Sequence, residues 1–214
     1  MQVPRRWSWS DGATAFDCCR KIFVMGTMFV LLPAAFLHFR GLDFEPTVSL
    51  MHIISSIHYH YVQDMDNPRA VTRRHETLMV LDYFWAHLDV CSCFVYLSGI
   101  QSRYLRAMAY MSFVYGLIAL LTSKDRKRRQ QHLAALVLGG GCSLLVGRYL
   151  LTGEAPRIKW SGLPIPFLLF GYAAYNFFIL QEKHPNMYWL HHGLWHITGN
   201  ATLLALIHLK YVNE

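Results

Sequence analysis

Five polar side chains in three apolar segments have types and spacings that suit metal chemistry. Ser56 and His60 are four residues apart, and so are His192 and His196, so each pair shares one face of a helix on successive turns. Two imidazoles at that separation can chelate a single metal ion. Alone, an HxxxH pair is weak evidence, because two histidines at a helix end are also tolerated without a ligand. Asp82, in the third segment, adds a carboxylate.

The composition indicates which class of protein must position these residues. Hydrophobic residues make up 54% of the 214-residue chain and charged residues only 15%, whereas a soluble domain usually carries about 25% charged residues. We therefore expect a polytopic membrane protein with one compact domain. A disordered chain and a coiled coil are excluded, and an ordinary cytosolic enzyme is disfavoured. The five cysteines show no CxxC spacing, so neither a disulfide framework nor a thiolate metal site is expected.

Seven segments are predicted to be spanning helices, each of which needs about 20 mostly apolar residues. They are 22–39, 46–62, 76–98, 104–122, 131–151, 163–181 and 186–208. By hydropathy the second, third and seventh segments are weak candidates for spanning helices, because they contain His, Asp, Ser or Asn. The other four are apolar enough to be clear candidates. Short connections favour antiparallel neighbours. The predicted fold is all-α, a seven-helix transmembrane bundle in up-down order at 22–208, between a basic polar segment at 1–21 and a short tail at 209–214.

The positive charges are expected to face anionic lipid headgroups. The net charge is +7, and the cations lie in short clusters between apolar runs, above all at 124–129. This distribution is typical of loops that hold helices against headgroups, and nucleic-acid binding is not expected. The N-terminal segment and the even-numbered loops carry more Lys and Arg than the other side, which predicts an inside N-terminus and an outside C-terminus.

Ionisable groups within spanning helices suggest function by default, because each costs about 2.5–3.5 kcal/mol on insertion scales. His60 lies about two to four residues from the inner end of its segment, and Asp82 and His192 each about six, so at about 1.5 Å per residue their depths agree to within roughly a turn. Three imidazoles with one open position form the ligand set of a catalytic zinc site. We therefore expect Zn²⁺ held by His60, His192 and His196.

The pattern resembles the CREST superfamily, which includes alkaline ceramidases, progestin and adiponectin receptors, GPI-remodelling lipid hydrolases and myomaker-like proteins. The resemblance rests on SxxxH at 56–60, Asp82 near the start of the third helix and HxxxH at 192–196 with Leu-Trp inside it. It covers the second to the seventh helix. It implies that the three histidines bind zinc, and that Asp82 and Ser56 hold the zinc-bound water and the developing oxyanion.

That resemblance implies hydrolysis of a membrane lipid amide or ester. Zinc lowers the pKa of a bound water toward about 7 and polarises a carbonyl. Asp82 is expected to act as general base and then to pass the proton to the leaving amine or alcohol. Ser56 is expected to donate a hydrogen bond to the oxyanion.

The chain also departs from the superfamily pattern. Some branches have an aspartate three residues after the histidine of the second helix, whereas Asp64 lies four residues after His60. The spacing from His60 to Asp82 is long for a ceramidase-type member and nearer to the myomaker-like branch. Some members have the N-terminus outside, opposite to the orientation that the cations predict.

Each residue also has a purely structural interpretation. Ser56 can bond back to the carbonyl of His52, as Ser often does in spanning helices, and Asp82 can pair with Arg73 or Arg74. For the other polar residues of these helices, a structural role is favoured over a catalytic one or is equally consistent with the sequence. His52 either supports the site or packs the bundle, Asp89 and His87 suggest a buried hydrogen-bond network, and His191 points away from His192.

Two other functions stay open. One is a non-catalytic CREST-like protein, such as a receptor, a fusogen or an accessory subunit of a membrane complex, which keeps the site for structure. The other is a haem protein with His60 and His196 as ligands on facing helices. An endomembrane of the ER or Golgi, or the plasma membrane, is favoured, with an organellar inner membrane still open.

Overall fold

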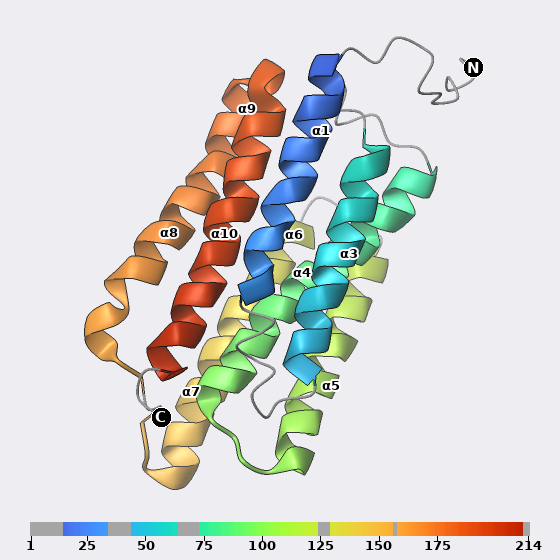
Figure 1. Cartoon of the computed structure of the whole chain (residues 1–214). Helices are drawn as coiled ribbons and strands as arrows, with labels where there is room; N and C mark the ends of the chain where they lie inside the picture. The colour runs from blue at the N-terminus through green and yellow to red at the C-terminus, as the bar shows by residue number, and fades with distance from the viewer. Residues whose placement is uncertain (1–14, 34–43, 64–72, 124–128, 156–157, 212–214) are drawn as a thin grey trace.

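The chain is a bundle of long helices, roughly aligned along one direction (Figure 1). The computed structural model describes residues 15–33, 44–63, 73–123, 129–155 and 158–211, and these contain no strand. The predicted all-α class is therefore confirmed, and seven helical rods correspond to the seven predicted segments. The basic residues 124–128, for which headgroup binding is expected, lie outside the described residues.

Some rods are single α-helices, and others combine α-helical, 3₁₀ and π-helical segments. The elements are α1 (Ala15–Thr27) continued by a 3₁₀ turn η1 (Met28–Leu31), α3 (Phe44–Val62), α4 (Arg73–Ser98), α5 (Arg103–Thr122), α6 (Arg129–Ala134), the π-helical turn η2 (Ala135–Gly139), α7 (Gly140–Thr152), η3 (Trp160–Gly162), α8 (Pro164–Tyr175), the π-helical turn η4 (Asn176–Leu180), α9 (Gln181–Lys183), η5 (Pro185–Met187) and α10 (Tyr188–Tyr211). The first rod begins at Ala15, before the expected start at Ile22.

Four helices are long and apolar enough to cross a membrane: His75–Ser98, Arg103–Thr122, Gln131–Thr152 and Trp160–Lys183. Three of these four helices correspond to segments that hydropathy predicted to be clear candidates for spanning helices. The third segment was predicted to be poor and nevertheless qualifies, because the long apolar run of α4 outweighs Asp82 and Asp89. The first segment was predicted to be clean, but its described part does not qualify. These four helices support an integral membrane protein.

Local sequence signals explain several helix ends. The Ser102 side chain accepts a hydrogen bond from the Leu105 amide at the start of α5, which satisfies one amide of the first turn. Pro164 lies in the first turn of α8, where its missing N–H costs nothing. Gly153 follows α7 with φ +70°, a left-handed conformation that glycine adopts without strain.

Cations bind carbonyl groups at the C-terminal ends of two helices. Lys21 Nζ donates to Tyr61 O in the last turn of α3 at 3.1 Å, and Arg148 donates to Ser98 O at the end of α4. The last carbonyls of a helix lack partners within it and carry partial negative charge, so a cation there is favourable. These contacts connect α1 to α3 and α7 to α4.

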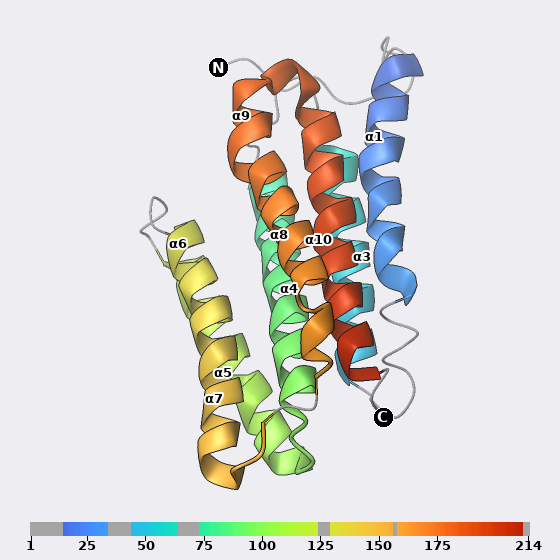
Figure 2. The ribbon, with the colours of Figure 1, turned by 90° about the vertical axis from the view of Figure 1, so that its left-hand side faces the viewer.

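The central helix of the bundle is α4, which packs against α3, α5, α7 and α10. On its other sides, α10 contacts α1 and α8, and Figure 2 shows α5 and α7 on one side of α4 with α10 and α1 on the other. Large apolar side chains are exposed on the outer helices, among them Met108, Leu150, Phe167 and Leu168. An outward apolar surface of this kind suits contact with lipid.

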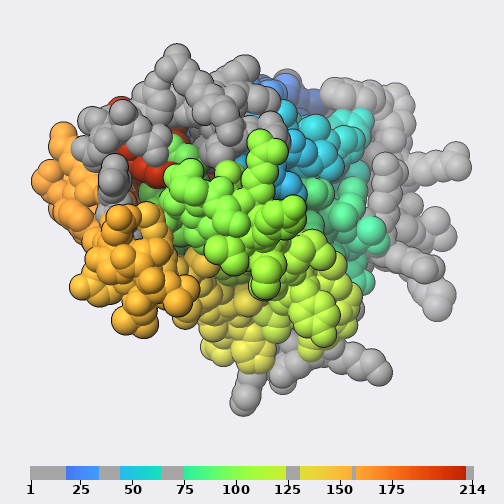
Figure 3. All heavy atoms as spheres, turned by 90° about the horizontal axis from the view of Figure 1, so that it is seen from below, coloured from blue at the N-terminus to red at the C-terminus, as the bar shows by residue number. Residues whose placement is uncertain are grey.

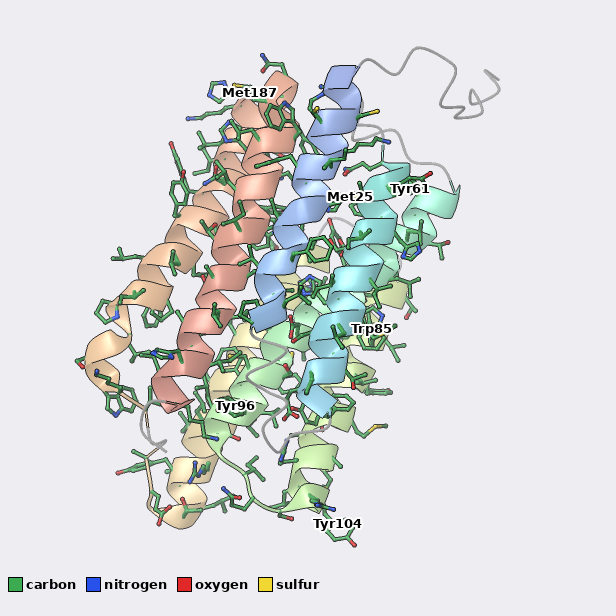
Figure 4. The ribbon with its side chains drawn as sticks, in the orientation of Figure 1. Met25, Tyr61, Trp85, Tyr96, Tyr104 and Met187 are labelled. Atoms are coloured by element: carbon green, nitrogen blue, oxygen red, sulfur yellow. The ribbon has the colours of Figure 1, made fainter. Side chains whose placement is uncertain are left out.

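The two ends of the bundle differ in what they contain. The C-terminal end of α3 and the N-terminal ends of α1, α4 and α10 lie together at the upper end in Figure 1. Tyr61 and Met187 lie toward this end in Figure 4, and Tyr104 lies at the opposite one. The lower end, shown in Figure 3, has the α4–α5 connection near its centre. All five predicted site residues come from the upper halves of α3, α4 and α10.

Candidate metal centre

Three buried histidines converge between α3 and α10. His60 is fully buried, and His192 and His196 are 7% and 6% exposed. One ligand atom of each lies within 4.8 Å of those of the other two, and Nε2 of His60 is 2.9 Å from Nε2 of His196. No other group of three or more potential metal-binding side chains is found in the described part of the chain.

The helix arrangement explains why these residues meet. His60 lies in the last turn of α3, which runs toward the upper end, and α10 begins there with Tyr188. His192 and His196 are one turn apart on α10, so their side chains project from the same face. The predicted agreement in depth therefore corresponds to a real cluster of imidazoles.

Two glutamines orient the imidazoles. Nδ1 of His60 bonds to Gln63 Oε1 at 2.8 Å, and Nδ1 of His192 bonds to Gln181 Oε1 at 3.2 Å. A carbonyl oxygen only accepts, so each Nδ1 carries the proton and each Nε2 keeps its lone pair. Support of this kind, in which the second ring nitrogen of a ligand is hydrogen-bonded, is usual at metal sites.

Gln63 is itself held by two tyrosines. Its Nε2 donates to the hydroxyl of Tyr59 at 3.2 Å and to that of Tyr188 at 3.0 Å. Gln63 is only 1% exposed, so all of its polar groups must find partners within the protein. The amide therefore connects α3 to the start of α10 beside the histidines.

The donor set fits a zinc ion. Two imidazoles on a tetrahedral zinc have nitrogens about 3.3 Å apart, since each Zn–N bond is about 2.0–2.1 Å. The Nε2 atoms of His60 and His196 are 2.9 Å apart, and the ligand atoms of all three histidines lie within 4.8 Å of one another, so the cluster has about the size that one zinc ion needs. At the distance between Nε2 of His60 and Nε2 of His196, two lone pairs repel each other unless a proton or a cation lies between the two nitrogens.

Unpaired polar atoms lie one helical turn deeper than the histidines. Ser56 is four residues before His60 and Asn200 four residues after His196. Ser56 Oγ, Asn200 Nδ2 and Asp82 Oδ1 are all buried, and none has a hydrogen-bond partner among the described residues. Buried polar groups are rarely left unpaired, and an absent water, ion or ligand is a common reason.

The structural interpretation predicted for Ser56 is not observed. The carbonyl of His52 accepts instead from Ser55 Oγ at 3.0 Å. The side chains of Arg73 and Arg74, the alternative partners of Asp82, lie outside the described residues. Asp82 is 6% exposed and close enough to Ser56 to interact with it electrostatically.

The remaining predicted polar residues have separate environments. Asp89 belongs to a buried hydrogen-bond network with Ser49 and His52, as the sequence suggested. His87 does not join it, because its Nδ1 bonds to the carbonyl of Tyr83 at 2.6 Å. His191 Nδ1 bonds to Asn176 Oδ1 at 3.2 Å, away from the three clustered rings.

Sequence reasoning missed the residues that support the site. Gln63 lies three residues after His60, and that spacing was the only available signal for its contact with His60. Gln181 has no local signal, because it reaches His192 from a different helix. Asn200 is one of the polar residues that make the seventh segment a weak candidate by hydropathy.

A helical chain with four candidate spans and a buried cluster of three histidines belongs to the class of integral membrane proteins with a candidate metal centre. Residues 17–197 match a family model described as protein of unknown function (DUF3522). The chain therefore belongs to the DUF3522 family, and the match covers all five predicted site residues. A comparison with curated proteins finds no match.

Proposed function

We propose that the protein is a zinc-dependent intramembrane hydrolase of a lipid amide or ester. The observations that carry the proposal are the cluster of three buried imidazoles, the unpaired Ser56 Oγ one helical turn from His60, and the unpaired Asp82 Oδ1 on the adjacent helix α4. The resemblance to the CREST superfamily assigns the same five residues to metal binding and catalysis and so supports it.

All seven rods are proposed to cross the bilayer in up-down order. Two of the three rods that are not among the four apolar candidates, α3 and α10, carry Ser56 and the three histidines, and these side chains are buried. The positive-inside bias then places the N-terminus and the metal centre on the inner side of an endomembrane or the plasma membrane. A substrate with its acyl chains in the inner leaflet has its carbonyl near this depth.

The residues have distinct parts in the proposed reaction. Zinc held by His60, His192 and His196 would supply a Lewis acid and lower the pKa of a water. Asp82 accepts a proton from the attacking water and later donates it to the leaving amine or alcohol. The Ser56 hydroxyl donates a hydrogen bond to the substrate carbonyl oxygen as negative charge develops on it.

The geometry argues against haem. Two axial histidines bind on opposite faces of the macrocycle, whereas Nε2 of His60 and Nε2 of His196 are 2.9 Å apart. No porphyrin fits between them. A structural zinc site in a non-catalytic membrane protein remains the alternative that the activity measurement addresses.

The proposal is tested by metal analysis and lipid hydrolysis on the purified protein. Wild type is expected to hold about one zinc per chain, and His196→Ala to lose most of it. His191→Ala is the matched control, because it removes the neighbouring imidazole, and it should keep the metal. Asp82→Ala should keep zinc but lose hydrolysis of lipid amides and esters. Zinc in wild type without turnover of either class would favour the non-catalytic alternative.

A further inference from the structure

Asn200 is a buried amide within the apolar helix α10, and the proposed mechanism gives it no part. It is 4% exposed, and its Nδ2 has no hydrogen-bond partner among the described residues. An unpaired buried donor lowers the stability of a fold, whereas a leucine of similar size at the same position would not. Packing alone therefore does not explain the amide, and a ligand that accepts a hydrogen bond from it does.

The contact between two of the histidines fixes the place of Asn200 in the bundle. Nε2 of His60 on α3 and Nε2 of His196 on α10 are 2.9 Å apart. The two helices run in opposite directions (Figure 1), so four residues away from the upper end lead from His60 to Ser56 and from His196 to Asn200. Four residues are about one turn along the same face of a helix. Ser56 and Asn200 therefore form a layer one turn below the histidine contact.

An apolar cluster lies directly below the Ser56–Asn200 layer. Ile53 is three residues before Ser56 and Leu203 three residues after Asn200, and both belong to one buried core cluster with apolar side chains of α4 and η1. Side chains of α3 and α10 thus meet above the layer through the histidines and below it through this cluster. Ser56 is fully buried as well, so the layer is screened from bulk water.

The two unpaired atoms of this layer are both donors on uncharged side chains. Ser56 Oγ carries one O–H bond, and Asn200 Nδ2 carries two N–H bonds. The two side chains are shorter than two imidazoles, and they form no hydrogen bond with each other. Donors from two facing helices can bind a single oxygen atom between them. Fixed donors in a site without water are the groups that best stabilise negative charge developing on such an oxygen.

We infer that Asn200 is a further catalytic residue, whose Nδ2 donates from α10 to the same substrate carbonyl oxygen that Ser56 binds from α3. The inference rests on the proposed function, because it needs a lipid amide or ester whose carbonyl enters this layer. The amide forms no covalent bond and transfers no proton. Its hydrogen bond strengthens as the oxygen gains negative charge, so it stabilises the transition state more than the bound substrate.

The test is Asn200→Leu, which removes the donor and keeps about the same volume. The variant is expected to hold about one zinc per chain, while its kcat for lipid amides and esters should fall about 100- to 1000-fold. A long-chain alkylphosphonate, whose oxygens mimic the oxyanion, should bind about 10- to 100-fold more weakly. The visible spectrum of the cobalt-substituted protein measures that binding.

Thr202→Val is the matched control on the same helix. Thr202 is also buried, at 6% exposed, but its hydroxyl already bonds to Thr198 O at 2.8 Å. The change removes a buried polar group outside the proposed layer, so wild-type kcat and phosphonate affinity are expected. Wild-type kcat and affinity in Asn200→Leu, or equal losses in Thr202→Val, overturn the inference.

Ser56→Ala separates a failure of this inference from a failure of the proposed function. It removes the donor that the proposed mechanism already uses, so it should weaken phosphonate binding to a similar extent. If Ser56→Ala weakens that binding and Asn200→Leu does not, the inference alone is overturned. Absence of metal or of hydrolysis in wild type overturns the proposed function, and this inference with it.

The melting temperature of the metal-free protein tests a purely structural role for Asn200, because no ligand takes part in that measurement. Asn200→Leu is expected to keep or raise the melting temperature, since it removes an unpaired buried donor. A lower melting temperature without a loss of phosphonate affinity shows that the amide is structural and overturns the inference. If Asn200→Leu does not fold, Asn200→Ala takes its place and must show the same losses of kcat and affinity.

Discussion

At the scale of single residues, the histidine cluster depends on side chains that are not themselves candidate ligands. Gln63 bonds to His60 and to two tyrosines at once, so it fixes which nitrogen of the imidazole is free. Without it, the ring can rotate and its Nδ1 loses a buried partner. Metal binding at the proposed centre is therefore expected to depend on a residue that is not itself a ligand.

Replacing Gln63 by alanine is expected to weaken zinc binding about 10- to 100-fold, the usual cost of losing such a hydrogen bond. Competition with a chelator of known affinity measures the change. Gln101→Ala, at an exposed position after α4, is the control and should leave the affinity unchanged. Equal affinity in Gln63→Ala and wild type would show that the ring needs no such support.

The sequence spacing predicts the clustered histidines but not the two glutamines that hydrogen-bond to them, and this difference has a physical cause. His60, His192 and His196 stand out because imidazoles are costly within apolar helices, and the i, i+4 rule places the last two together. A glutamine has no such cost at a helix end. The contact between Gln181 and His192 depends on how α9 meets α10, which no local pattern encodes.

At the scale of helices, most ends follow from local chemistry. Pro164 and Gly153 mark a start and an end that the sequence also indicates. The π-helical turns η2 and η4 were not predicted, because a π turn depends on packing along the rod and has no distinctive residue pattern here. The early start of α1 at Ala15 was also missed, since the prediction began at the long apolar run and Asp17, Arg20 and Lys21 interrupt the residues before it.

Gly99, just after α4, should resist substitution. It has φ +62°, and a Cβ there would lie 2.6 Å from the Arg148 guanidinium, which binds the end of the same helix. Gly99→Ala should lower the free energy of unfolding by about 1–2 kcal/mol, mainly from the left-handed backbone. Thermal unfolding in detergent measures it.

The control for that change is Gly147→Ala, in the regular part of α7, where an added Cβ meets nothing within 4 Å. It should be neutral or stabilising, since alanine favours helix over glycine by about 1 kcal/mol. A melting temperature as low for Gly147→Ala as for Gly99→Ala would mean that the backbone conformation at Gly99 is not the cause.

At the scale of the whole molecule, the candidate site lies toward one end of the bundle. The three histidines, Ser56 and Asp82 lie in the upper halves of α3, α4 and α10, and Gln63 and Gln181 lie beside them at the end of α3 and on α9. The lower half contains other buried polar contacts, such as Glu45 with Arg106 at 2.6 Å and with Tyr110 at 2.5 Å. The four apolar helices support the membrane protein that the composition predicts, and the histidine cluster lies toward the end of the bundle that the depths of His60 and His192 predict.

The orientation in the membrane can be measured with single introduced cysteines. A cysteine at Asn186, in the turn before α10, should be protected from a membrane-impermeant maleimide added outside, and one at Thr152, at the end of α7, should react. Neutralising Lys124, Arg126, Lys127 and Arg128 together should weaken this preference, because these residues supply much of the positive-inside bias. Labelling at Asn186 but not at Thr152 in the otherwise unchanged chain would reverse the orientation.

X-ray absorption at the zinc edge of the purified protein tests the central claim most directly. The expected spectrum has three imidazole nitrogens at about 2.0–2.1 Å and one oxygen from water. His192→Ala should lose an imidazole contribution or lose the metal. A spectrum with sulfur at about 2.3 Å, or with fewer than three imidazoles in wild type, would contradict a zinc site built by His60, His192 and His196.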